Sequence, residues 1–187
     1  MSGTERPITL ADLDPADEAA TAQAAELLVA AFPSWDRDEA REQVALSLGA
    51  ERICLAARAG EEVLGWVGAM PSYSHAWELH PLVVRENARR RGIGRALVAA
   101  LEERLRGREV LTLYLGTDDE GEMPGTSAWG VDLFPDPLVH AADLAVIDHP
   151  AGFYRRLGFT AIGLIPDANG PGKPDILMAK RISACGR

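Results

Sequence analysis

Arginines and glycines gather in one short run, from Arg89 to Arg95, and these residue types suit the capture of an anion. The run follows an apolar stretch that ends at Val84 and precedes a helical pattern. Apolar residues recur in that pattern every three or four positions: Ile93, Leu97, Val98, Leu101 and Leu105. Gly92 and Gly94 lie where the helix opens, so an anion can approach the unpaired N–H groups at the positive end of its dipole. The pattern predicts binding of a pyrophosphate.

Two glycines alone would equally suit a flexible turn before a surface helix. The ordered string Arg-Arg-Arg-Gly-Ile-Gly, placed between a strand and a helix, favours the anion site. A dinucleotide-binding fold is disfavoured because its fingerprint needs a third glycine-like position and a later acidic residue. The position three residues after Gly94 is Leu97, and the charges around the turn are basic.

The charges fall into two adjacent blocks of opposite sign. The segment 85–108 holds eight arginines and three glutamates, whereas 109–154 holds nine acids and neither Lys nor Arg. Either block alone would suit a solvated face. Together they suit a protein that binds an anionic cofactor and a cationic acceptor. The formal net charge of -9, and the lack of aromatic residues among the arginines, argue against a nucleic-acid module.

Length and composition bound the rest. A chain of 187 residues, 47% hydrophobic and 25% charged, predicts a single globular domain over 1–187. No apolar run is long enough to span a bilayer, and the first residues do not form a leader, so a cytoplasmic location is expected. Cys54 and Cys185 suggest no disulfide framework, and His75, His140 and His149 show no metal-ligand pattern, so no metal is expected.

The order of predicted elements gives the fold class. Strands are expected at 8–11, 52–58, 63–70, 79–84, 110–115, 159–165 and 176–182. Helices are expected from Asp14, as N-cap, to 31, from the Asp36/Glu39 capping box onward, and at 93–105, 138–147 and 150–157. The segment 116–133 reads as a long loop, and the crossover between 79–84 and 110–115 favours a parallel pair. We therefore predict an α/β fold, a mixed sheet flanked by helices.

Four further stretches resemble the aminoglycoside 6′-N-acetyltransferases of the GNAT superfamily, and the likeness covers nearly the whole chain. They are Trp-Glu-Leu-His-Pro-Leu-Val-Val from 77, Tyr-Leu-Gly-Thr-Asp-Asp from 114, the segment 149–159 with His-Pro and Phe-Tyr-Arg-Arg-Leu-Gly-Phe, and 166–176 with Pro-Asp-Ala-Asn-Gly and Lys-Pro-Asp-Ile. The arginine–glycine turn is shared by the superfamily, whereas the Glu-Leu-His-Pro and Leu-Gly-Thr-Asp-Asp segments point to this subgroup. The resemblance implies a largely antiparallel sheet with a splayed central strand pair.

The resemblance implies acetyl-coenzyme A as co-substrate, lying between the strands 79–84 and 110–115. The backbone N–H of Leu82 matches the family's donor to the thioester oxygen, an oxyanion-hole role. Pro81 cannot donate to the sheet ladder, which fits an interrupted edge. The residues implied to bind the cofactor are Leu82, Val83, Val84, Arg89, Arg90, Arg91, Gly92, Ile93, Gly94 and Arg95.

The acid–base roles also follow from the resemblance. Tyr154 matches the acid that protonates the leaving thiolate, and Glu78 matches the group that receives the proton of the amine. From spacing alone, Tyr154 could equally be a core aromatic and Glu78 an exposed charge at a strand end. His80 lies near Glu78 in sequence and could position the substrate or act as a base.

The acceptor implied by the resemblance is an aminoglycoside, attacked directly at its 6′-amine in a ternary complex. Asp118, Asp119 and Asp175 match positions near its pocket and would pair with ammonium groups. In the same loop the chain reads Glu120-Gly121-Glu122 where the family has an aspartate. The full set implied to contact the acceptor is Trp35, Glu78, His80, Asp118, Asp119, Glu122 and Asp175. Trp35 would otherwise be a plug of the core between two helices.

Two alternatives remain beside this interpretation. An enzyme of the same fold could acetylate a peptide, a polyamine or another small amine. A non-catalytic acyl-coenzyme A sensor is a second alternative, which the presence of both Glu78 and Tyr154 disfavours. The resemblance also implies a homodimer, and Trp129, Phe134 and Leu138 could either form that interface or close a core.

Overall fold

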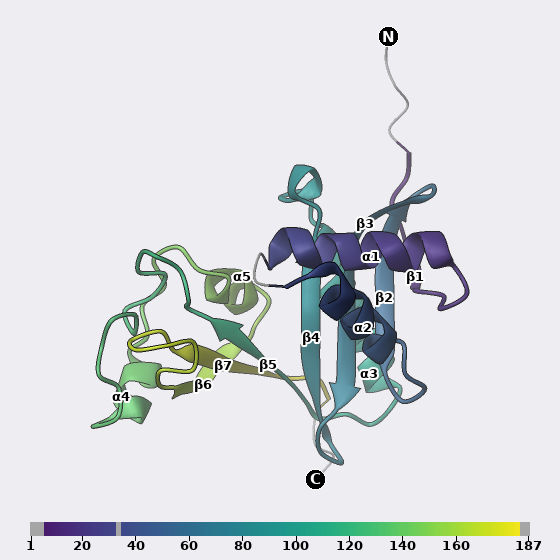
Figure 1. The fold of residues 1–187 in the computed structure, drawn as a ribbon. Helices are drawn as coiled ribbons and strands as arrows, with labels where there is room; N and C mark the ends of the chain where they lie inside the picture. Colours follow the sequence, from purple (N-terminus) through teal and green to yellow (C-terminus); the bar gives the residue numbers. More distant parts are fainter. Residues whose placement is uncertain (1–5, 33–34, 184–187) are drawn as a thin grey trace. The chain divides into compact units, whose positions relative to one another are not determined.

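The computed structural model describes residues 6–32 and 35–183, so the Pro33-Ser34 break between the first two helices and Cys185 lie outside the described residues. The chain divides into two compact units, unit 1 (1–110) and unit 2 (111–187). Each unit is a small sheet with its own helices (Figure 1).

Unit 1 contains four strands and three α-helices. Its elements are β1 (Thr9–Asp12), α1 (Glu18–Ala31), α2 (Arg37–Ser47), β2 (Ile53–Ala59), β3 (Glu62–Pro71), β4 (Ala76–Val84), the short 3-10 helix η1 (Glu86–Ala88) and α3 (Ile93–Arg106). The strands lie in the order β1-β2-β3-β4, and the pairings are antiparallel. In Figure 1, α1 and α2 lie in front of this sheet and α3 behind it.

The core of unit 1 follows the predicted apolar stripes. Ala20, Ala24, Leu27 and Leu28 of α1 are buried against the sheet. Trp66 of β3 is fully buried, and its ring N–H donates to the carbonyl oxygen of Ala24 at 3.1 Å. The five apolar residues predicted for α3, from Ile93 to Leu105, are all buried, which confirms that helix and its face.

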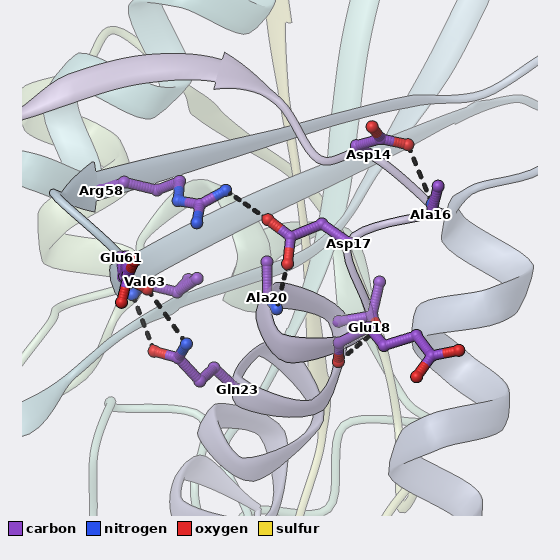
Figure 2. Close-up of polar contacts among 10 residues, drawn as sticks. Asp14, Ala16, Asp17, Glu18, Ala20, Gln23, Arg58, Glu61 and Val63 are labelled. Carbon is purple, nitrogen blue, oxygen red and sulfur yellow. Dashed lines mark hydrogen bonds and ion pairs between the residues drawn. The ribbon is translucent and has the colours of Figure 1, made fainter.

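The predicted start of the first helix is wrong by three residues, because Asp17 and not Asp14 is the N-cap. Figure 2 shows Asp17 accepting from the Ala20 N–H at 2.9 Å and from the Arg58 guanidinium at 2.8 Å. These contacts hold the pKa of Asp17 below its ordinary value, and the hydrogen bond from the Ala20 N–H has the largest effect. Asp14 instead accepts from the Ala16 N–H in the preceding turn. The Asp36/Glu39 capping box of α2 is present as predicted.

Unit 2 contains three strands and two short helices. Its elements are β5 (Thr112–Asp118), α4 (Pro137–Ala142), α5 (Ala151–Arg156), β6 (Thr160–Ile165) and β7 (Asp175–Arg181). The strands lie in the order β5-β7-β6, and both pairings are antiparallel. In both units, antiparallel strands with flanking helices confirm the predicted α/β fold class.

Two predicted boundaries in unit 2 need correction. The strand expected to end at 115 continues to Asp118, because β5 pairs with β7 along its whole length. The helix expected over 138–147 is α4, which ends at Ala142. Beyond it, Val146 bridges to Thr126 and the Ile147 N–H donates to Gly125, so this segment pairs with the loop 119–126 instead of continuing the helix. The parallel, splayed pairing of 79–84 with 110–115 stays a prediction.

Candidate active site

The arginine–glycine turn of unit 1 forms the start of α3. Gly92 is its N-cap, with a left-handed φ of 83°, and beyond its neighbours in the chain no described residue has an atom within 4 Å of the place where a Cβ would stand. Arg89, Arg90, Arg91 and Arg95 are exposed around it. The first N–H groups of an α-helix have no acceptors within the helix. The turn is therefore open and positively charged, which fits a pyrophosphate.

The predicted turn residues have different roles. The Ile93 side chain is 3% exposed and anchors α3 in the core, so only its backbone N–H can serve an anion. Arg85, which was not predicted to bind the cofactor, donates to the Val63 carbonyl and lies 3.4 Å from Glu62. Its guanidinium ties the end of β4 to β3.

A cavity of about 530 Å³ lies beside this turn within unit 1. Val84 and Arg89, both predicted cofactor residues, line one side of it. The end of α1 lines the other, with Leu27, Ala30 and Ala31 supplying apolar surface. The cavity thus offers an apolar wall next to the positively charged turn.

Strand β4 runs unbroken through Pro81, and the irregularity there lies only in its pairing with β3. The pairing with β3 shifts between Val67 and Ala69, so that Gly68 faces both His80 and Pro81. A Cβ at Gly68 would stand 2.5 Å from the His80 carbonyl oxygen, so only glycine lets β4 approach this closely. The His80-Pro81 peptide is cis. Glu78, His80 and Leu82 are half-buried along this strand, while Val83 is buried in the core.

Trp35 has the core environment that the sequence offered as the alternative, and its contact with the acceptor stays a prediction. It packs half-buried against the core of unit 1, with its ring 5.4 Å from that of Phe32. It also borders a second cavity, of about 240 Å³, on the surface of α2. The other residues that line this cavity are Glu39, Glu42, Gln43 and Leu46.

In unit 2, Asp118 and Asp175 face each other directly across β5 and β7. Like charges at directly opposed positions destabilise a sheet unless a cation or a donor offsets them. Asn169 donates its side-chain amide to Asp118 at 2.6 Å. A Cβ at Gly116 would stand 2.5 Å from the Asp175 carboxylate, so the glycine leaves room for that carboxylate over β5. The pair forms an acidic position suited to an ammonium group.

Asp119 points the other way, into the loop that follows β5. It is 2% exposed, and its carboxylate accepts from the Gly125 N–H, the Thr126 N–H and the Thr126 hydroxyl at 2.8–3.1 Å. Its carboxylate therefore organises the loop from 119 to 126. Glu122, by contrast, has a 99% exposed side chain, 3.7 Å from the Lys173 ammonium.

Tyr154 lies on α5, 8% exposed, between the rings of Phe153 and Phe159. Burial raises the pKa of its phenol well above the ordinary value. The hydroxyl therefore keeps its proton across neutral pH, as a general acid requires.

His149 joins Tyr154's helix to the end of β5. Its Nδ1 accepts from the Ala151 N–H at 3.2 Å, which fixes the tautomer whose Nε2–H donates to the Asp118 carbonyl at 2.8 Å. The predicted set contains neither His149 nor Asn169. Their signal in the sequence was the His-Pro and Asn-Gly pairs, which predict only a helix start and a turn.

The predicted residues gather in two groups. In unit 1, Glu78, His80 and Leu82 to Val84 lie on β4, which precedes the turn in the chain. In unit 2, Asp118 and Asp175 are paired, and His149 connects Asp118 to the helix of Tyr154. Among residues 6–32 and 35–183, no group of three or more His, Cys, Asp or Glu side chains could hold a metal ion. In the same part of the chain, no helix is long and apolar enough to cross a membrane.

The comparisons with known proteins agree on the family. The model of the acetyltransferase (GNAT) family matches residues 21–124. A comparison with curated proteins gave no match. A solved aminoglycoside 6′-N-acetyltransferase complexed with coenzyme A is 36% identical, with a TM-score of 0.90 over 96% of this chain and 99% of its own. The aminoglycoside 6′-N-acetyltransferase from Enterococcus faecium is also 36% identical, with a TM-score of 0.88 over the same shares.

A third structure, aminoglycoside 6′-acetyltransferase type Ii, is 34% identical, with a TM-score of 0.75 over 95% of this chain and 99% of its own. Because these likenesses run through both units, they extend the family assignment beyond the segment matched by the family model. The open, basic turn at the start of α3 fits acetyl-coenzyme A as the acetyl donor. The chain is therefore an acetyltransferase that belongs to the GNAT family.

Proposed function

We propose that this protein transfers the acetyl group of acetyl-coenzyme A to the 6′-amine of an aminoglycoside, and so acts as an antibiotic-resistance enzyme of the cytoplasm. The observation that carries the proposal is the directly opposed pair Asp118 and Asp175. Such a pair suits a polycationic acceptor, and the three similar structures named above are aminoglycoside acetyltransferases. Since the likeness covers 95–96% of the chain, we propose that both units are needed for activity.

The residues of the chain would act as follows on a direct attack in a ternary complex. Acetyl-coenzyme A, when bound, supplies an activated thioester. The turn at Gly92 holds its pyrophosphate, and the Leu82 N–H donates to the thioester oxygen. Glu78 receives the proton of the attacking amine, and His80 helps to position the acceptor. Tyr154, whose phenol is protonated at neutral pH, protonates the leaving thiolate.

The acceptor contacts divide the predicted carboxylates. We assign the ammonium groups to Asp118 and Asp175, with Trp35 and Glu122 as outer contacts. Asp119 is assigned to the loop because three donors already occupy its carboxylate. Asp118→Asn and Asp175→Asn should each raise the KM of the acceptor by about 10- to 150-fold, while the KM of acetyl-coenzyme A stays constant.

Asp119→Asn is the matched variant for this comparison, since it removes the neighbouring charge. It should lower the free energy of unfolding, by about 1–3 kcal/mol for each buried donor left unmatched. Denaturant melts and steady-state kinetics on the three variants would separate the two roles. Equal KM changes for Asp118→Asn and Asp119→Asn would contradict the assignment.

The reaction itself can be tested with two acceptors that differ at one position. Neomycin carries an amine at the 6′ position and paromomycin a hydroxyl. Release of the coenzyme A thiol should be rapid with neomycin and absent with paromomycin. Release with spermidine or a peptide, but with neither aminoglycoside, would leave an acetyltransferase of another amine.

We also propose a homodimer, with its contact on unit 2. Large apolar side chains are exposed on α4, on β6 and just before α4: Phe134, Leu138, Val139, Ile162 and Ile165. Exposed apolar groups of this size commonly mark an interaction surface. Trp129 is half-buried and donates to the Gly121 carbonyl, so we assign it to the acidic loop and not to the interface.

A further inference from the structure

Lys173 brings a positive charge into the acidic loop of unit 2. Its ammonium donates to the Glu120 carbonyl at 2.9 Å and lies 3.7 Å from the Glu122 carboxylate. The sequence from Glu109 to Tyr154 contains neither Lys nor Arg. The loop that joins β6 to β7 thus supplies a cation that the acidic segment lacks.

The backbone around Lys173 holds this ammonium in place. The Lys173 N–H donates to the Gly170 carbonyl at 2.9 Å, and its own carbonyl accepts from the Asn169 N–H at 3.0 Å. Pro174, the next residue, accepts from the Asp119 N–H at 2.9 Å. The Lys173 side chain is only 29% exposed, whereas that of Glu122 is 99% exposed. Lys173 is therefore the more fixed partner of the two.

Lys173 also stands at the end of the sheet where the acceptor carboxylates lie. It precedes Asp175 by two residues, and Asn169 of the same loop donates to Asp118. Its charge lowers the negative potential that an approaching polycation meets at this end of β5 and β7. Its ammonium also occupies the Glu120 carbonyl, which could otherwise accept from an ammonium group of the acceptor.

We infer that Lys173 is a specificity-determining residue: its ammonium occupies a cation position next to the acceptor carboxylates and so limits the binding of acceptors that carry additional ammonium groups. This inference rests on the proposed aminoglycoside acetylation. Acceptors with fewer amines do not need the position that Lys173 fills. Acceptors with more amines meet a like charge there, which weakens their binding.

The test removes the charge and keeps the side-chain stem. Lys173→Met should lower the KM of neomycin by about two- to fivefold at low salt, the range expected of partly exposed ion pairs. The KM of kanamycin A, which has fewer amines, should change less, and that of acetyl-coenzyme A should stay constant. Lys173→Arg should behave as the wild type. This fall in the KM of neomycin should be smaller at moderate salt, and smaller when Glu122→Gln is also present.

Arg41→Gln provides the matched control, because it removes one positive charge from an exposed ion pair of α2 with Asp38. It should leave the KM of both acceptors unchanged, whereas an equal fall would assign the effect to net charge and overturn the inference. An unchanged or raised KM for neomycin in Lys173→Met would also overturn it and leave Lys173 as a support of the loop. If the wild type acetylates neither aminoglycoside, the proposed function fails and this inference falls with it.

Discussion

Tyr154 holds its phenolic proton more tightly than a tyrosine in water does. Its ring lies between two phenylalanines, and burial favours the neutral form, so its pKa rises above the ordinary value of about 10. Tyr154 should therefore stay protonated throughout the working range of the enzyme. Loss of activity between neutral pH and about pH 10 would then report a different group.

Tyr154→Phe should lower kcat by roughly 10²-fold or more, because it removes the acid and almost no volume. Assays of thiol release would measure kcat, and calorimetry would measure the affinity for coenzyme A. Tyr73→Phe is the matched control, since Tyr73 is 72% exposed and should change neither. Full turnover in Tyr154→Phe would remove the proposed acid.

Cys54 is a second buried acid, with no part in the reaction. Burial, and then the charge of Asp12, raise the pKa of its thiol from 9.0 to about 12. The unfolded chain loses this proton near the ordinary value, while the folded chain keeps it. The free energy of unfolding should therefore fall as pH rises from about 9 to about 12.

In a Cys185→Ser background, Cys54 should react with a thiol reagent at pH 8 only after denaturation. Cys54→Ala should flatten the alkaline decline in stability. Denaturant melts at several pH values would measure this decline in both proteins. Rapid labelling of the folded protein at pH 8 would contradict the burial of this thiol.

At the scale of elements, a substitution at the start of α3 should affect cofactor binding and folding stability differently. Gly94→Asp places a negative charge in the first turn, where the helix dipole favours it, so thermal stability should hold or rise slightly. The same charge would repel the pyrophosphate, and the affinity for coenzyme A should fall about tenfold or more. Calorimetry and thermal melts on one sample would measure both.

Ala99→Asp adds the same charge to the exposed face of α3, farther along the helix. It should leave coenzyme A affinity nearly unchanged. If Gly94→Asp bound coenzyme A normally, the assignment of this turn would be wrong. If both variants lost affinity equally, net charge and not the turn would explain the effect.

The sequence predicted elements well wherever the signal was local. The stripe of α3 and the Asp36 capping box each depend on neighbouring residues, and both are present. The first helix start was misplaced because Asp14 and Asp17 offer the same local signal. Asp17, which caps the helix, accepts a hydrogen bond from Arg58, a residue 41 positions away in sequence.

The acidic residues of the candidate site also depend on contacts that their local sequence does not contain. Asp118, Asp119 and Glu120 are consecutive, and nothing in their types shows which one turns inward. Thr126 and Gly125 supply the donors that hold Asp119. Pairing with β7 extends β5 and places Asp118 opposite Asp175, a relation across 57 residues that periodicity in one segment does not contain.

For the whole molecule, the basic segment is separate from both the acidic segment and the exposed apolar groups. The basic segment 85–108 belongs to unit 1, and the acidic segment 109–154 lies almost wholly in unit 2. The exposed apolar residues of α4 and β6 also belong to unit 2. Assembly of two copies and binding of the cofactor should therefore be separable by mutation.

Leu138→Glu combined with Ile162→Glu should convert a dimer to a monomer, because each places a charge on an apolar surface. Light scattering after size exclusion would measure the mass. Leu46→Glu is the matched control, since Leu46 is 49% exposed on α2 of unit 1. A monomeric wild type, or a dimer that survives both charges, would contradict the proposed contact.

The contact between Gly172 and Gly130 has a consequence for how such an enzyme could change its acceptor range. A Cβ on Gly172 would stand 2.9 Å from the Gly130 Cα, and the Gly130 N–H donates to the Gly172 carbonyl at 2.7 Å. Both residues also have left-handed φ angles. The two loops therefore constrain each other's backbone, and neither can be lengthened or replaced alone. Substitutions that change the range of acceptors should therefore gather at side chains such as Glu122 and Lys173, while positions 130 and 172 remain glycine.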